Sequence, residues 1–150
     1  MTTAPGFTLV RDFDATPEEI WSAWTDPDEV AQWLHARGLT TPRESVTVDA
    51  RVGGSYAYTM VHDESGESYP TGGVYLEMQP FERLVFTWGM PDTDPSEAPV
   101  VTVTLGENGD RTRMTFDLRG VEGTAGDGSF YDGWDSALEV LDEYLMGSVS

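Results

Sequence analysis

A stripe of large apolar side chains near the end of the chain limits the folds open to it. Its members recur every three or four residues, the spacing of one face of an α-helix, and they are Phe130, Trp134, Ala137, Leu138, Leu141 and Leu145. Ser129 is a suitable N-cap for this helix, and Asp132 and Asp135 suit its positive end. Gly147 can end it. A helix of about 18 residues is roughly 27 Å long, which is enough to cross a whole sheet.

Segments typical of β-strands occupy most of the preceding chain. The first covers residues 7–13, where the apolar residues Phe7, Leu9 and Phe13 fall on one face and Arg11 is the polar member of that face. Arg11 is a cation near apolar positions in an acidic chain, so we expect it to form an ion pair. Six more strands are expected at residues 45–49, 55–62, 68–79, 83–90, 100–106 and 112–119. Short turns between them favour an antiparallel meander, and the Pro-rich link 91–99 is the candidate for a mobile flap.

Two short helices are expected in tandem after the first strand. Thr16 can cap one of them, with Pro17 in its first turn and Glu19 at the capping-box position. Asp26-Pro27 repeats the same device ten residues later. Each helix carries Trp on its apolar face: Trp21 and Trp24 in the first, and Trp33 in the second.

This order of elements predicts one α+β domain over residues 1–150 with a helix-grip fold. About seven antiparallel strands need a cover for their apolar face, and the final helix is the only expected element long enough to supply it. A sheet of that size twists and curls, so a straight helix cannot fill the concave face to both ends. A ligand cavity between the helix and the sheet follows from this geometry.

The charge balance excludes some classes of partner. The chain has 27 acidic residues against 8 basic ones, a net charge of −19, and all eight basic residues are Arg. A surface this acidic disfavours binding to nucleic acid or to anionic lipid. No apolar window approaches the length of a membrane span, and residues 1–6 show no basic start or apolar segment. We therefore expect a cytoplasmic protein without membrane insertion.

Four segments resemble the activator-of-Hsp90-ATPase-homologue-like branch of the START-like (SRPBCC) superfamily, in the order of that family. The first runs from Arg11-Asp12-Phe13 through Trp21 to Trp24-Thr25-Asp26-Pro27 and Trp33. The others are Asp49-Ala50-Arg51-Val52-Gly53-Gly54, then Gly73-Val74-Tyr75-Leu76-Glu77-Met78 with Phe86-Thr87-Trp88, and finally Gly133-Trp134 with Leu138, Leu141 and Leu145. The resemblance implies a helix-grip, Bet v 1-like fold and a pocket for a hydrophobic small molecule or lipid-like ligand.

The chain departs from the resemblance at one segment. Many relatives carry a Trp-Trp-Gly-Pro-like run where this chain reads Trp33-Leu34-His35-Ala36. The role that this loop has in those relatives is therefore not carried over to residues 34–36.

Aromatic and Met side chains in the strands supply the candidate ligand contacts. Tyr and Trp have polar tips and Met adapts to variable shapes, so a set rich in all three suits a pocket better than a dry core. Taken singly, each is more often a plain core residue. The predicted lining is Trp33, Tyr58, Met60, His62, Phe86, Trp88, Phe116, Phe130, Trp134 and Leu138.

Catalytic and metal chemistry have little support in the sequence. His62 shares a strand face with Tyr58 and Met60, so His62 and Tyr58 are weak candidates for an acid and base pair; a His at a strand end beside a polar turn is the simpler interpretation. The chain has two His and no Cys, and no spacing is typical of a metal site or a phosphate-binding loop. We predict no metal and no cofactor.

The leading hypothesis is a non-catalytic binding protein. Its expected ligand is a hydrophobic or aromatic small molecule of lipid-like or polyketide-like character. One alternative is a cyclase, aromatase or hydrolase that uses the same cavity. Another is an interaction module linked to a chaperone of the Hsp90 type. A second copy of the chain is a further candidate partner, as a weak homodimer.

Overall fold

The computed structural model describes residues 5–124, 126 and 130–147. Three elements follow the start of this range: strand β1 (Gly6–Phe13) and the two short helices α1 (Pro17–Thr25) and α2 (Pro27–Trp33). A small region comes next, with β2 (Leu39–Thr40), the 3-10 turn η1 (Arg43–Ser45) and β3 (Thr47–Val48). The long strands are β4 (Ser55–His62), β5 (Ser68–Gln79), β6 (Arg83–Thr87), β7 (Val100–Asn108) and β8 (Arg111–Arg119). Helix α3 (Phe130–Gly147) ends the described chain.

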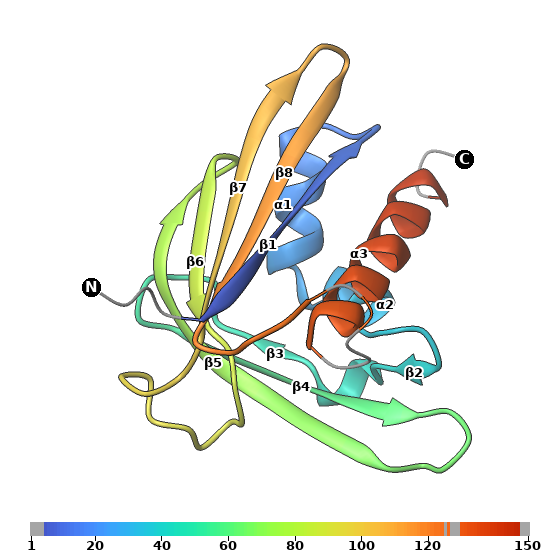
Figure 1. Cartoon of the computed structure of the whole chain (residues 1–150), viewed down its shortest axis with the longest axis vertical. Helices are drawn as coiled ribbons and strands as arrows, with labels where there is room; N and C mark the ends of the chain where they lie inside the picture. Colours follow the sequence, from blue (N-terminus) through green and yellow to red (C-terminus); the bar gives the residue numbers. More distant parts are fainter. Residues whose placement is uncertain (1–4, 125, 127–129, 148–150) are drawn as a thin grey trace.

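All strand pairs are antiparallel and form one curved sheet in the order β1-β8-β7-β6-β5-β4-β2, with β3 also paired to β4. Helix α3 lies beside β1 and α2 on one side of this sheet, whereas the β4–β5 hairpin extends beyond it (Figure 1). The predicted helix-grip fold, with two short helices after the first strand and a long final helix, is confirmed. The Ser129 cap lies outside the described residues.

The local signals for α1 and α2 act as the sequence predicts. The Thr16 hydroxyl accepts the amide N–H of Glu19 at 3.1 Å, and the Glu19 carboxylate accepts the amide N–H of Thr16 at 3.0 Å. These two bonds form the capping box of α1. Asp26 caps α2 by accepting the amide N–H of Asp28 at 2.9 Å. The two helices therefore begin at Pro17 and Pro27, each directly after its cap.

Two predicted strand boundaries were wrong. Residues 45–49 were expected to form one strand, but the chain makes the turn η1 and then only the two residues of β3. The Ser45 hydroxyl donates to the Pro42 carbonyl at 2.7 Å, a local bond that competes with strand pairing. The strand expected at 83–90 ends at Thr87: the Trp88 amide N–H still donates to the Pro99 carbonyl opposite it, but Pro99 has no N–H to return the bond. Strand β2 was not predicted.

The core lies between α3 and the sheet and extends under α1 and α2. Trp134, Ala137, Leu138, Leu141 and Leu145 of the apolar stripe are buried, while Phe130 at the start of α3 is 40% exposed. Arg11 on β1 forms the expected ion pair, and its partner is Asp135 on α3. This pair joins the first strand to the polar edge of the helix.

Candidate ligand cavity

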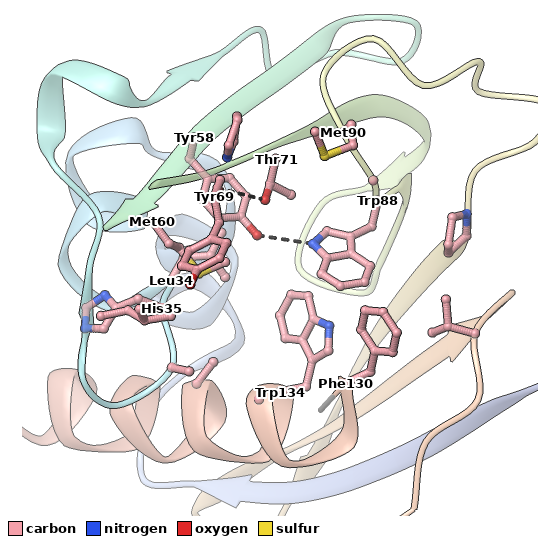
Figure 2. Close-up of a pocket in the computed structure, with 18 of the residues that line it drawn as sticks. Leu34, His35, Tyr58, Met60, Tyr69, Thr71, Trp88, Met90, Phe130 and Trp134 are labelled. Atoms are coloured by element: carbon pink, nitrogen blue, oxygen red, sulfur yellow. Dashed lines mark hydrogen bonds between the residues drawn. The ribbon is translucent and has the colours of Figure 1, made fainter. Parts of the chain in front are cut away.

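A cavity of about 770 Å³ lies between the first turns of α3 and the β4–β5 hairpin. The loop after α2 and the segment after β6 complete its wall (Figure 2). Its volume falls within the range of sites that hold a small molecule. The described residues that line it are Leu34, His35, Ala36, Leu39, Tyr58, Met60, Ser68, Tyr69, Pro70, Thr71, Trp88, Gly89, Met90, Pro99, Val121, Phe130, Gly133, Trp134 and Ala137.

A close approach of β5 to β6 directs Trp88 into this cavity. A Cβ atom on Gly73 would lie 2.0 Å from the Thr87 carbonyl oxygen, so only glycine fits beside Thr87. The Thr87 hydroxyl accepts the amide N–H of Val74 at 2.9 Å and replaces a ladder bond at this point. After Thr87 the chain leaves β6, and the Trp88 ring faces Tyr58 and Trp134 across the cavity (Figure 2).

Three aromatic rings form one corner of the wall. Trp88 meets Phe130 edge to face, with ring centroids 5.7 Å apart and an interplanar angle of 85°. It meets Trp134 at 5.5 Å and 62°. Such tilted pairs are the arrangement that aromatic rings prefer. The Trp134 indole N–H is buried and has no hydrogen-bond partner in the described part of the chain, so packing alone holds this ring.

The main polar groups of the wall are the Tyr58 hydroxyl on β4, the Thr71 hydroxyl on β5 and the Trp88 indole N–H after β6. The Trp88 indole N–H donates to the Tyr58 hydroxyl oxygen at 3.2 Å (Figure 2). Burial raises the pKa of Tyr58 to about 12, and hydrogen bonds from Trp88 and Thr71 oppose this shift only in part. Tyr58 therefore keeps its proton at neutral pH.

His35 is the imidazole that lines the cavity. Its Nδ1 atom is buried and has no hydrogen-bond partner among the described residues. Burial lowers the pKa of His35 below its usual value, and the negative charge of Asp63 offsets part of this effect. The ring is therefore uncharged at neutral pH. His35 belongs to the segment 34–36, where the sequence departs from the family resemblance.

The structure divides the ten predicted lining residues into two groups. Five line the cavity: Tyr58, Met60, Trp88, Phe130 and Trp134. Trp33, Phe116 and Leu138 are buried in the core behind it, and Phe86 lines a separate void of about 20 Å³, too small for a ligand. His62 lies outside the lining.

The acid and base pair considered for His62 and Tyr58 is not assembled in the cavity. The His62 Nδ1 atom accepts the amide N–H groups of Glu64 and Ser65 at 3.3 and 3.2 Å. These bonds tie the ring to the turn between β4 and β5. The Tyr58 hydroxyl oxygen instead accepts the Trp88 indole N–H, as described above.

Most of the lining residues that the sequence reasoning missed come from loops and from the β5 strand. Periodicity assigns faces within a strand but says nothing of which loops fold over it. The sequence gives a signal for three of them, because residues 34–36 depart from the family resemblance. Tyr69 and Met90 are large apolar residues with 42% and 54% exposure, and with Phe130 they mark the open side of the cavity.

The fold and the cavity define a START-like helix-grip protein. Residues 14–146 match the family described as Activator of Hsp90 ATPase homolog 1-like protein, and the chain belongs to this family. The resemblance found in the sequence is thereby confirmed. A comparison with curated proteins finds no significant match.

Solved structures from bacteria share the fold over nearly the whole chain. A protein from Chromobacterium violaceum is similar, with 28% identity, a TM-score of 0.81, and coverage of 93% of this chain and 96% of that one. A protein from Nitrosomonas europaea has 21% identity, a TM-score of 0.80, and coverage of 99% and 98%. An HSP90 activator from Plasmodium falciparum is 20% identical over 80% of this chain and 76% of that one, with a TM-score of 0.59. The last two likenesses concern the fold alone.

Among the described residues, no cluster of three or more His, Asp or Glu side chains could hold a metal ion. Of the helices that the structure describes, none combines the length and the apolar character required to cross a membrane.

Proposed function

We propose that the protein binds a hydrophobic or aromatic small molecule in the cavity between α3 and the β4–β5 hairpin. The observation that carries this proposal is the size of the cavity together with the apolar character of its wall. A packed protein interior leaves few voids larger than a water molecule, so a space of about 770 Å³ is not a packing defect.

The open side of the cavity supports the same function. Tyr69, Met90 and Phe130 remain 42%, 54% and 40% exposed there, although removing apolar surface from water is favourable by about 25 cal/mol per Å². A bound apolar molecule would cover them and replace the contacts that the empty space withholds. Trp88 and Trp134 would supply flat faces for an aromatic ring.

Native mass spectrometry with the purified protein tests this proposal. The protein is incubated with uncharged probes of increasing size, from naphthalene to fluorenone and progesterone. We expect complexes of one probe per chain, and a rise in the melting temperature that grows with probe concentration. Failure of every probe to bind at its solubility limit would contradict the proposal.

A role linked to a chaperone is the second candidate function. Membership of the family favours it, together with the likeness of the fold to the Plasmodium falciparum HSP90 activator. The measurement is the ATPase rate of an Hsp90-type chaperone with and without the protein. An increase that saturates with protein concentration would support this role, and an unchanged rate would contradict it.

A further inference from the structure

The wall of the cavity offers no charge to a ligand. Among the described lining residues, the groups that can ionise near neutral pH reduce to His35, whose pKa is lowered by burial. Tyr58 also stays neutral, as argued above. A carboxylate or an ammonium group placed in such a space would lose its hydration and gain no partner of opposite charge.

The cations of the protein are already paired. The sequence contains no Lys, and all eight Arg residues lie in the described part of the chain. Seven form ion pairs with carboxylates: Arg11 with Asp135, Arg37 with Glu139 and Glu143, Arg43 with Asp28, Arg51 with Asp49, Arg83 with Glu77, Arg113 with Asp12, and Arg119 with Asp117. The eighth, Arg111, donates to the Asp12 carbonyl at 3.1 Å. With a net charge of −19, the molecule also repels anions at long range.

The wall does offer a hydroxyl proton. The Trp88 N–H donates to the Tyr58 oxygen, and this bond leaves the Tyr58 hydroxyl proton for another acceptor. The Thr71 hydroxyl donates to the Tyr69 carbonyl at the long distance of 3.4 Å. Both hydroxyls lie in the cavity wall (Figure 2). Neither hydroxyl proton is held by a short hydrogen bond, so either can turn toward a better acceptor in the cavity.

We propose that the cavity is specific for uncharged apolar molecules that carry one oxygen acceptor, such as a ketone, and that the hydroxyl pair of Tyr58 and Thr71 donates to this oxygen. The inference rests on the proposed function and narrows its ligand class. It assigns Tyr58 and Thr71 as specificity-determining residues and excludes free carboxylates as preferred ligands.

Three probes of one shape test the ligand class: fluorenone with a ketone, fluorene with a methylene in its place, and fluorenone carboxylate, which is ionised at neutral pH. Dissociation constants are measured by quenching of Trp fluorescence at pH 7. We expect fluorenone to bind at least about tenfold more tightly than the carboxylate, since that anion finds no cationic partner in the wall. Equal or tighter binding of the carboxylate would overturn the assignment.

The variant Tyr58→Phe removes one hydroxyl and keeps the ring. We expect the preference for fluorenone over fluorene to fall by about 3- to 10-fold, the effect of one hydrogen bond. The carbonyl stretching band of bound fluorenone should also move to higher wavenumber as that bond is lost. Comparing this preference between the variant and the wild-type protein cancels the different solubilities of the two probes in water. Thr71→Val, which removes the second hydroxyl, should lower the same preference.

Phe130→Leu is the matched control, because it removes apolar area from the wall and no hydrogen bond. It should weaken fluorenone and fluorene equally and leave the carbonyl band unchanged. If both probes bind but neither hydroxyl variant alters their ratio or the band, the role of the hydroxyl pair is wrong while the proposed function stands. If neither neutral probe binds the wild-type protein, the proposed function itself fails.

Discussion

The variant Gly133→Trp is expected to lose binding of apolar ligands by about 10- to 100-fold while the protein stays folded. Gly133 lies on α3 and lines the cavity. A Cβ atom built there has no neighbour within 4 Å, so a side chain can enter without displacing the backbone. An indole ring would occupy space that a ligand needs and would bury apolar area of its own. Titration with fluorenone and thermal unfolding measure the two effects.

Gly133→Ala is the control for this variant. Alanine adds one methyl group to the cavity and removes a glycine from a helix, which should stabilise the protein by up to about 1 kcal/mol. We expect its affinity for fluorenone to remain within about twofold of the wild-type value, a change of less than 0.5 kcal/mol. If Gly133→Trp binds fluorenone as tightly as Gly133→Ala, the ligand site does not lie in this cavity.

Trp33→Ala should produce the largest loss of stability. The Trp33 side chain is fully buried, and its indole N–H donates to the Ala23 carbonyl at 2.7 Å. Its ring packs against Trp24 with centroids 4.7 Å apart. Removing a buried Trp side chain typically lowers the free energy of unfolding by about 3 to 5 kcal/mol. Urea denaturation followed by circular dichroism measures the change.

Trp21→Ala is the matched control in the neighbouring helix. Trp21 is only partly buried, and its ring contact with Phe81 lies at the protein surface, where Phe81 is 45% exposed. We expect a clearly smaller loss of stability from this change. Equal losses from the two variants would show that α1 and α2 do not pack as described.

The fold could be predicted because its signals are local and agree with one another. The helix caps, the period of the final helix and the turns between strands each act over a few residues, and all of them favour one arrangement. The errors fall where a single side chain decides the outcome. At Ser45 a hydroxyl bonds to its own turn, and opposite Trp88 the ring of Pro99 leaves no N–H to continue the ladder.

The cavity could be predicted only in part. Tyr58 and Met60 follow from the alternation of β4. Phe86 was predicted on the same ground, as a large aromatic side chain in a strand, but it lies in the core. What separates Trp88 from Phe86 is the end of β6, which no periodicity indicates. Residues 34–36 line the cavity for a different reason: the chain leaves α2 there and folds back toward α3, where the Arg37 amide donates to Ser136 at 2.8 Å.

Leu34, His35 and Ala36, where the sequence departs from the family resemblance, form one part of the cavity wall. A Trp-Trp-Gly-Pro-like run would bring a second large ring and a proline to this loop. Here the same positions provide an aliphatic side chain, a neutral imidazole and a methyl group that all line the cavity. We therefore expect the ligand preference of this protein to differ from that of relatives that carry the run.

A crystal structure of the protein grown with a bromine-substituted fluorenone tests the central claim most directly. We predict an anomalous bromine peak inside the cavity, with the fused rings in contact with Trp88 and Trp134. The ketone oxygen should lie within hydrogen-bond distance of the Tyr58 or Thr71 hydroxyl. A cavity closed by its own side chains, with bromine found only at the protein surface, would contradict the claim.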